Sequence, residues 1–472
     1  MQSIPVNHKI FPMSYRHSYF LISPFLLLIF LFGCRSTGQL EESQSAKDME
    51  TSSPLQMMVE SSEVFSSNVT GFVLFDPQTD STLFSLNGNK YFTPASNTKL
   101  FTLYAGLKAL PDNLRALEYV IRGDSLIFWG TGDPSFLHRE YGSDTVYDFL
   151  KNSSEDLYYS DHHFDDEPLG AGWSWDDYNS YYSAEKSPFP IYGNMVQFTF
   201  ENIEFNRIKK NGGQYKITPK VFQKRINEQS GENRSGLFRE RIGNQFEYFP
   251  QADTTTYDIL KPFHYTPELI TEMLSDTLGK PVEYIELEKP SDSEVLYSVP
   301  ADTAYKRMLQ PSDNFIAEQL ILMIASERGE PLNTEKVIEY ITDNHLADLP
   351  DEPQWADGSG LSRYNMFTPR SIVRLLQKID NEFESDEQMY GLFPAGGESG
   401  TIQNWYAHRE GKEPYVFSKT GTLMNNHCLS GFIVTESGQK LIFSFMNNHY
   451  VTSSSVVKEE MEKVLWYIYS HY

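Results

Sequence analysis

A serine and a lysine three residues apart form the first candidate catalytic pair in this sequence. Ser96 and Lys99 stand in the run Ser-Asn-Thr-Lys, at the first turn of a helix that Pro94 is expected to open. Residues three apart on a helix share a face, so the Ser96 hydroxyl and the Lys99 amine can meet. A serine hydroxyl becomes a good nucleophile when a base takes its proton, and a desolvated lysine can be that base. The start of a helix adds free N–H groups where an oxyanion would form.

The same Ser-x-x-Lys spacing recurs, so spacing alone does not identify the nucleophile. The further copies are Ser183/Lys186, Ser437/Lys440 and Ser455/Lys458. The first runs into Ser-Pro, the second lies in an expected hairpin turn, and the third starts the terminal helix. The copy at Ser96 opens a helix with a full stripe of leucines at helical spacing. This context favours Ser96 as the nucleophile.

Two further polar motifs complete a set used in acyl transfer. Ser312-Asp313-Asn314 begins a predicted helix, and Lys419-Thr420-Gly421-Thr422 ends a predicted strand. Ser-x-x-Lys, Ser-Asp-Asn and Lys-Thr-Gly are the motifs of penicillin-binding proteins and class A β-lactamases. Each motif alone has an ordinary structural explanation, such as a helix cap or a strand end. The three in this order, each on the expected element, predict an acyl-enzyme site.

Beyond its amino-terminal leader, almost the whole chain resembles the low-molecular-mass class C penicillin-binding proteins, the D-alanyl-D-alanine carboxypeptidase/endopeptidase family. The resemblance rests on PASNTKLFT (94–102), WGTGDPSF (129–136), GWSWDD (172–177), SDNFIAEQL (312–320), DGSGLSR (357–363) and SKTGT (418–422). The long interval between Ser96 and Ser312 agrees with it, because this family places accessory domains there.

The resemblance implies a serine-type carboxypeptidase/endopeptidase that acts on peptidoglycan stem peptides and is acylated by β-lactams. Ser96 would attack the D-Ala carbonyl while Lys99 takes its proton. The backbone N–H groups of Ser96 and Thr422 would hold the oxyanion. A β-lactamase is one alternative, although the base that fast deacylation needs has no motif shortly after the serine. A non-catalytic penicillin-binding envelope lipoprotein is the other.

The resemblance also assigns roles to the second and third motifs. Ser312 would pass a proton to the leaving amine, and Asn314 would steady the peptide amide. Lys419 and Thr420 would bind the terminal carboxylate of the substrate, while Gly421 would let the strand approach it closely. No cofactor and no metal are expected in this chemistry.

Asp177 and Arg363 are candidate substrate contacts outside the three motifs. In the family that the chain resembles, acids of the insert and an arginine after the Gly-Ser-Gly-Leu-Ser turn help to bind the stem peptide. Trp173 and Trp175 flank Asp176 and Asp177. A solvated turn beside a packed pair of indoles is therefore the alternative interpretation, and Asp176 is the weaker candidate of the two acids.

The elements that must position these residues come from both ends of the chain. Residues 71–75 and 82–86 are expected to form two strands just before the helix that carries Ser96. Three more strands are expected at 415–418, 429–435 and 440–446, followed by a terminal helix. We therefore expect an α/β (α+β) fold: a penicillin-binding or β-lactamase-like transpeptidase domain, with an antiparallel sheet flanked by helices.

The sequence divides into a leader, a linker, a catalytic domain and an insert. Residues 1–34 read as a lipoprotein-type signal peptide, and residues 35–63, rich in Ser, Glu, Gln and Thr, as a flexible linker. Residues 64–115 and 296–472 are expected to form the catalytic domain. Residues 116–295, between the first two motifs, are expected to be a large β-rich insert of one or two accessory domains.

The leader predicts export and a lipid anchor. Residues 20–32 form an apolar run of signal-peptide length, too short to span a bilayer comfortably. The run ends at Leu31-Phe32-Gly33-Cys34, which resembles a bacterial lipobox with a lipidated cysteine. We expect a periplasmic protein of the cell envelope, anchored to a membrane through Cys34. An ordinary cleaved signal with an incidental cysteine is the alternative.

Composition excludes several classes of function. The 472 residues carry a formal net charge of −25, which argues against a nucleic-acid partner because such proteins need a basic face. The two cysteines, Cys34 and Cys428, are too few for a disulfide scaffold or a Cys-rich metal site. The adjacent His162 and His163 lack the spacing of zinc ligands.

Overall fold

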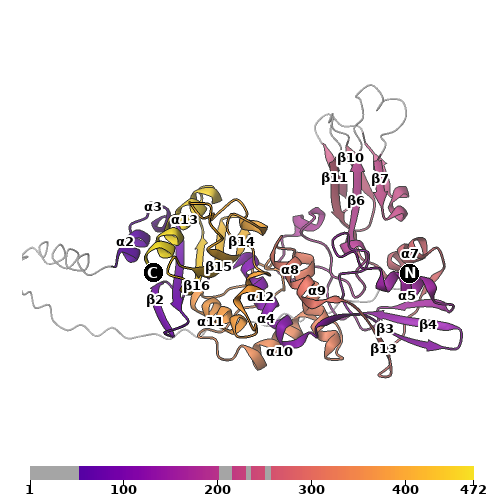
Figure 1. Cartoon of the computed structure of the whole chain (residues 1–472). Coiled ribbons are helices and arrows are strands. Elements are labelled where there is room, and N and C mark those ends of the chain that lie inside the picture. Colours follow the sequence, from indigo (N-terminus) through magenta and orange to yellow (C-terminus); the bar gives the residue numbers. More distant parts are fainter. Residues whose placement is uncertain (1–52, 201–214, 230–234, 250–256) are drawn as a thin grey trace, which may run out of the picture. The chain divides into compact units, whose positions relative to one another are not determined.

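A five-stranded antiparallel sheet joins the two ends of the chain in the computed structural model, which describes residues 53–200, 215–229, 235–249 and 257–472 (Figure 1). The strand order is β14-β15-β16-β1-β2. The strands are β1 (Val69–Asp76), β2 (Ser81–Leu86), β14 (Val416–Leu423), β15 (Asn426–Val434) and β16 (Lys440–Asn448). The predicted sheet from both ends of the sequence is confirmed.

Tight turns fix the register of this sheet. The Asp76 carboxylate accepts hydrogen bonds from the Gln78 N–H (2.9 Å) and the Thr79 hydroxyl (2.7 Å), closing the turn from β1 to β2. Asn425, with φ of 65°, closes the short turn from β14 to β15. Lys419 then pairs with Ser430 across the sheet, which places the third motif on a central stretch of β14.

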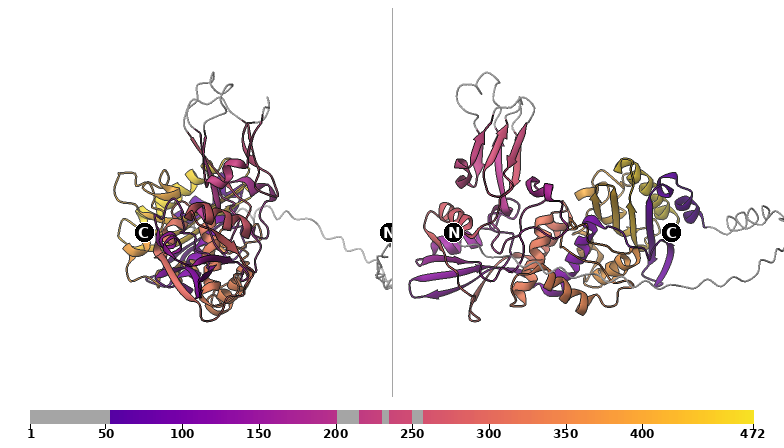
Figure 2. Two further views of the ribbon diagram at one scale, coloured as in Figure 1. Left: turned by 90° about the vertical axis from the view of Figure 1, so that its right-hand side faces the viewer. Right: turned by 180° about the vertical axis from the view of Figure 1, so that it is seen from behind.

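Helices cover both faces of the sheet. Alternate residues of β1 face opposite cores, since Val73 belongs to one buried apolar cluster while Phe72 and Leu74 belong to another. The first face packs against α4 (Lys99–Ala109), α8 (Ala301–Leu309), α9 (Asn314–Glu327), α10 (Thr334–His345), α11 (Pro369–Asp380) and α12 (Asp386–Tyr390). The second packs against α13 (Ser454–His471), which Figures 1 and 2 draw in yellow along the strands.

The flexible linker predicted over 35–63 is wrong for its last residues. They form α2 (Pro54–Glu60), and α3 (Glu63–Ser66) follows; Leu55 and Val59 are buried in the cluster that includes α13. Ser53 caps α2, with Pro54 in its first turn, so a helix start signal was present in a polar stretch. Cys34, the apolar run and residues 35–52 lie outside the described residues. Among those described, no helix combines the length and apolarity that crossing a membrane requires.

The insert has its own buried core. A five-stranded sheet, in the order β12-β5-β4-β3-β13, packs with two helices, and two three-stranded sheets have the orders β11-β6-β7 and β8-β10-β9. The elements of the first sheet are β3 (Asn113–Arg122), β4 (Ser125–Gly130), β5 (Asp156–Ser160), β12 (Val282–Tyr284), β13 (Glu294–Pro300), α5 (Thr145–Asn152) and α7 (Pro267–Leu278). The short strands are β6 (Met195–Phe200), β7 (Tyr215–Thr218), β8 (Ile226–Glu228), β9 (Gly236–Arg239), β10 (Phe246–Phe249) and β11 (Tyr257–Pro262).

The first and last strands of the insert pair with each other. Asn113 in β3 lies opposite Pro300 in β13, so this sheet begins and ends a few residues outside the predicted interval 116–295. The chain leaves and re-enters the catalytic region through neighbouring strands. Single 3-10 turns complete the described elements: η1 (Ala95–Thr98), η2 (Trp175–Asn179), η3 (Tyr192–Asn194), η4 (Lys220–Lys224) and η5 (Gly400–Ile402).

Candidate active site

Ser96 lies on a constrained turn between the sheet and α4. It belongs to the 3-10 turn η1, and the preceding Ala95 has a φ of 49°, a conformation that residues with a side chain rarely adopt. Asn97 locks this turn to the sheet: its side-chain amide donates to the Lys419 carbonyl (2.8 Å) and accepts from the Ser430 hydroxyl (2.7 Å). The turn that carries Ser96 is therefore constrained by the backbone of Ala95 before it and by the side-chain hydrogen bonds of Asn97 after it.

Gly421 lets β14 approach this turn closely. A Cβ at this position would lie 2.2 Å from the Pro94 carbonyl oxygen and 3.1 Å from the Ser96 nitrogen. Both contacts are with backbone atoms, which cannot move aside as a flexible side chain would. A glycine is required for the third motif to run alongside the nucleophile.

The Lys99 amine joins the first two motifs. Its Nζ donates to the Ser96 Oγ (3.2 Å), to the Asn314 Oδ1 (2.6 Å) and to the Ser359 carbonyl oxygen (2.7 Å). The side chain is completely buried. The predicted meeting of Ser96 and Lys99 on one face is therefore present, and Asn314 joins them.

The third motif meets the second through another buried lysine. The Lys419 Nζ donates to the Ser312 Oγ (2.7 Å) and to the Thr420 carbonyl oxygen (2.7 Å). Ser312 has a φ of 64°, so its hydroxyl is presented from a constrained position just before α9. The Thr420 hydroxyl is 2.8 Å from that of Thr401. Five side chains from three distant segments thus converge on one site: Ser96, Lys99, Ser312, Asn314 and Lys419.

Burial sets the electrostatics of the two lysines. It lowers the pKa of Lys99 to about 8, although the carboxylates of Asp357, Glu318 and Asp313 act in the opposite direction. Burial, and then the charge of Lys99, hold the pKa of Lys419 well below its usual range. Both amines therefore lose a proton more readily than an exposed lysine does.

A single residue, Tyr182, connects Asp177 to Asn314 of the second motif. The Tyr182 hydroxyl donates to the Asp177 Oδ1 (2.7 Å), and the Tyr182 carbonyl accepts from the Asn314 side-chain nitrogen (2.9 Å). The insert thus reaches Asn314 through a backbone carbonyl, while Asp177 itself is partly exposed in η2. Asp176 is exposed.

Arg363 lies beside the same loop of the insert. Its backbone N–H donates to the Gly172 carbonyl (3.1 Å), and its side chain is exposed. The Trp173 indole N–H donates to the Asp357 carboxylate (2.9 Å), so the two loops that hold Asp177 and Arg363 are joined. Trp175 is 67% exposed and lies under the Arg241 guanidinium, 4.5 Å from the ring centre, so the two indoles do not form a packed pair.

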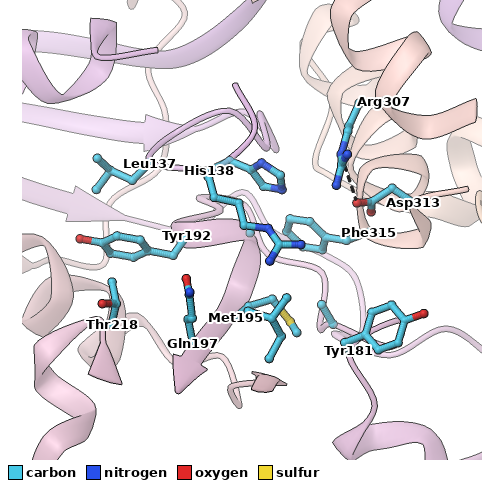
Figure 3. A pocket seen from close by; sticks show the side chains of 14 residues that line it. Leu137, His138, Tyr181, Tyr192, Met195, Gln197, Thr218, Arg307, Asp313 and Phe315 are labelled. Carbon is cyan, nitrogen blue, oxygen red and sulfur yellow. Dashed lines mark ion pairs between the residues drawn. The ribbon is translucent and has the colours of Figure 1, made fainter. Parts of the chain in front are cut away.

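A cavity of about 100 Å³ lies beside the second motif, where the insert meets α8 and α9 (Figure 3). Its lining includes His138, Tyr181 and Tyr192 from the insert, and Arg307, Asp313 and Phe315 from the catalytic region. One Asp313 oxygen accepts from the Ile316 N–H and caps α9, while the other is 3.9 Å from the Arg307 Nε. This cavity borders the Ser-Asp-Asn motif on its insert side.

Sequence reasoning missed three residues that hold the site together. Tyr182 and Ser359 contribute backbone carbonyls, which every residue has, so residue type gave no signal. Glu318 is a fully buried carboxylate on α9. Its signal was available, because an acidic residue stands among the apolar residues of SDNFIAEQL.

The model of the D-Ala-D-Ala carboxypeptidase 3 (S13) family matches residues 52–467. The D-alanyl-D-alanine carboxypeptidase DacB of Haemophilus influenzae is 24% identical over 428 residues, 82% of this chain and 86% of that protein. The penicillin-sensitive carboxypeptidase A of Dictyostelium discoideum is 22% identical, over 81% of this chain and 83% of its own length.

A solved structure supports the fold. The crystal structure of penicillin binding protein 4 (dacB) from Haemophilus influenzae superposes with a TM-score of 0.72 at 20% identity, covering 89% of this chain and all of that one. This likeness confirms the predicted penicillin-binding fold. The family match over most of the sequence shows that the chain belongs to the D-Ala-D-Ala carboxypeptidase 3 (S13) family and is a serine-type carboxypeptidase.

Proposed function

We propose that this D-alanyl-D-alanine carboxypeptidase works through an acyl-enzyme on Ser96, with Lys99 as the base. The observation that carries the proposal is the position of the Lys99 amine, in hydrogen-bond contact with both the Ser96 Oγ and the Asn314 Oδ1. A base must lie within hydrogen-bond reach of the proton that it takes. With its pKa lowered to about 8, Lys99 has a neutral fraction at neutral pH that an exposed lysine lacks.

The first chemical step then forms the acyl-enzyme. The Ser96 oxygen attacks the carbonyl carbon of the penultimate D-Ala, and its proton passes to Lys99. The N–H groups of Ser96 and Thr422 receive the developing oxyanion, and the glycine at 421 allows the strand to lie close enough. The bond from that carbon to the nitrogen of the last D-Ala breaks, and water later releases the peptide from Ser96.

Ser312 and Lys419 serve the leaving group and the substrate carboxylate. The Ser312 hydroxyl accepts from the Lys419 amine, so a proton can pass along this pair to the departing nitrogen. Asn314 steadies the peptide amide. Lys419 and Thr420 meet the terminal carboxylate, whose negative charge favours the protonated form of Lys419 on binding.

The substrates are peptidoglycan stem peptides, and β-lactams are the inhibitors. One solved structure of the Haemophilus influenzae penicillin binding protein 4 is a complex with a β-lactam, and it has a TM-score of 0.66 to this chain. Asp177 and Arg363 contact the part of the stem peptide that lies on the insert side of Asn314. Cleavage of cross-links, the endopeptidase reaction, would use the same acyl-enzyme.

A lipid anchor at Cys34 would hold the enzyme in the cell envelope. The support is the apolar run that ends at Leu31-Phe32-Gly33-Cys34, and the substrate itself lies outside the cytoplasm. The protein should partition with membranes, and Cys34→Ala should release it or leave it unprocessed. Equal membrane association of both forms, with no acyl mass on residue 34, would remove the anchor from the proposal.

The experiment that tests the function combines purified muropeptides with mass spectrometry of the products. Loss of the terminal D-Ala is expected with the natural chain and not with Ser96→Ala. Ser455→Ala is the matched control, because Ser455 also precedes a lysine by three residues but lies at the start of α13. A chain that releases no D-Ala but hydrolyses penicillin rapidly would be a β-lactamase. No change in either substrate would support the non-catalytic lipoprotein.

A further inference from the structure

Three oxygen atoms contact the Lys99 amine: those of the Ser96 hydroxyl, the Asn314 amide and the Ser359 carbonyl. The proposed reaction gives roles to the first two. In the neutral state that accepts a proton, a lysine amine has two N–H donors and one lone pair. If the two N–H groups donate to Asn314 Oδ1 (2.6 Å) and to the Ser359 carbonyl (2.7 Å), the lone pair faces the Ser96 hydroxyl. The Ser359 carbonyl is therefore as necessary as Asn314 for aiming the base.

That carbonyl belongs to a turn held by two buried carboxylates, those of Asp357 and Glu318. The Gly360 N–H, which shares a peptide group with the Ser359 carbonyl, donates to the Asp357 Oδ1 (2.8 Å). The Glu318 oxygens accept hydrogen bonds from the Gly358 N–H (3.2 Å) and the Ser359 N–H (2.8 Å). Glu318 is completely buried and follows Asn314 by four residues on α9, so both project from the same face of one helix. The same helix thus holds the Lys99 amine twice, once through Asn314 and once through this turn.

The turn has no room to move independently. A Cβ at Gly358 would lie 2.5 Å from the Ala317 carbonyl of α9, and one at Gly360 would lie 2.0 Å from the Ala95 carbonyl. Residues 358–360 are therefore packed between α9 and the turn that carries Ser96. The hydrogen bonds that Glu318 accepts hold the Gly358 and Ser359 N–H groups, and the bond that Asp357 accepts from the Gly360 N–H holds the next peptide group, which carries the Ser359 carbonyl.

We propose that Glu318 is a positioning residue of the reaction: its carboxylate holds the turn from which the Ser359 carbonyl aims the Lys99 amine at Ser96. The proposal rests on the proposed function, since it takes Lys99 as the base. Glu318 touches neither Ser96 nor a substrate group, and its effect passes through the turn and through its charge.

The charge of Glu318 acts on Lys99 as well. The charged groups around Glu318 are Asp357 in the turn, Lys186 from the insert and Lys99 on α4. Burial and the Asp357 charge raise the pKa of Glu318, while Lys186 and the two N–H donors favour its ionised form. Lys186 is itself paired with Asp166 (2.9 Å). Because an ionised Glu318 raises the pKa of Lys99, removing its charge should lower that pKa.

The test is the pH dependence of acylation by a chromogenic β-lactam in Glu318→Gln. The glutamine amide keeps one acceptor oxygen but turns an NH2 group toward the other N–H donor. The plateau rate of acylation should fall about ten-fold, because the base is no longer held in line. The acidic limb of the pH–rate profile, where acylation slows as Lys99 becomes protonated, should move to lower pH by about one unit. The reason is that the negative charge of Glu318 beside Lys99 is gone.

Glu327→Gln is the matched control on the same helix. The Glu327 carboxylate is 2.7 Å from the Arg115 guanidinium, away from the turn, so its loss should leave the pH profile and the plateau at their natural values. A folded Glu318→Gln with an unmoved limb and the natural plateau would overturn the proposal. So would a fall in melting temperature with the profile unchanged, because that would show a structural role alone.

Glu318→Asp covers the case in which the glutamine variant does not fold. The aspartate keeps the charge but withdraws it by one methylene, so the limb should stay at its natural pH while the plateau falls. A natural plateau in this variant, or failure of both variants to fold, would also overturn the proposal. Penicillin labelling that survives in Ser96→Ala would instead refute the proposed function itself, so the two failures are distinguishable.

Discussion

The catalytic region and the insert hold their polar side chains near Ser96 in different ways. In the catalytic region, Lys99 and Lys419 are completely buried, and each has at least two oxygen partners within 2.7 Å. The insert offers a backbone carbonyl at Tyr182 and a partly exposed carboxylate at Asp177. A buried polar group left without its partner costs much more than an exposed one.

Under the proposed function, residues of the catalytic region carry out the chemistry and residues of the insert affect the choice of substrate. The catalytic side chains are desolvated, so small changes alter their proton affinity and orientation. The contacts of the insert are open to solvent, so their loss should weaken substrate binding while the nucleophile stays intact. Substitutions in the catalytic region should therefore strongly slow the reaction with every substrate. Substitutions in the insert should slow it by an amount that depends on the substrate.

Lys99→Met should cause the largest loss. The thioether occupies a similar volume but cannot accept a proton, so acylation by penicillin and peptide hydrolysis should both fall about a thousand-fold, as expected for a lost general base. The melting temperature should stay near its natural value, because a buried amine is replaced by an apolar group. Stopped-flow or gel-based acylation rates check this. A loss restricted to the peptide substrate would break the comparison.

The natural chain should acylate more slowly as pH falls through the range around the pKa of Lys99, about 8. Protonated Lys99 cannot accept the Ser96 proton, so the rate rises with pH through that value. In Lys419→Gln this acidic limb should stay near its natural pH, because burial and the carboxylates of Asp357, Glu318 and Asp313 set the pKa of Lys99. Rates must be read at saturating β-lactam, since the variant also loses its carboxylate partner. A limb that moves to higher pH in a folded variant would show that the charge of Lys419 also lowers the pKa of Lys99.

Asp177→Ala should separate the two substrates. A small β-lactam need not reach the insert, so its acylation rate should change less than two-fold. Hydrolysis of a stem peptide should fall about five-fold, in keeping with the loss of one exposed charge contact. Parallel kinetics on both substrates check this. Equal losses would show that Asp177 acts on the site through Tyr182 instead of on the peptide.

Tyr182→Phe should have the smallest effect. It removes the hydroxyl that donates to Asp177 but keeps the carbonyl that accepts from Asn314. Penicillin acylation should be unchanged, and peptide hydrolysis should fall by no more than about two-fold. The same paired assay measures it. A large loss on both substrates would show that the hydroxyl, and not only the carbonyl, holds Asn314 in place.

Much of the catalytic region could be predicted from sequence because its signals are local. Apolar alternation and turn residues predicted the strands that became β1, β15 and β16, and motif order predicted which side chains would meet. The helix at 54–60 was missed because its short apolar sequence, with Leu55 and Val59 buried, stands between two stretches rich in Ser and Glu. Their burial depends on α13, about 400 residues away in the chain, and no local pattern reports such a contact.

The parts of the site that sequence could not provide are backbone groups and long-range burial. Ser359 and Tyr182 act through carbonyl oxygens, which carry no residue identity. The first motif indicates a desolvated lysine but not the charges that surround it. The burial of Lys99 is complete, and the opposing carboxylates of Asp357, Glu318 and Asp313 come from segments that only the fold brings together.

The residue to which a penicillin becomes covalently attached tests the assignment of Ser96 most directly. The protein should be labelled with a penicillin, digested, and mapped by mass spectrometry. The mass of the opened β-lactam is expected on the peptide that contains Ser96, with fragment ions that place it on that residue. An adduct on Ser183, Ser312 or Ser455, with the Ser96 peptide unmodified, would show that the buried Lys99 does not activate Ser96.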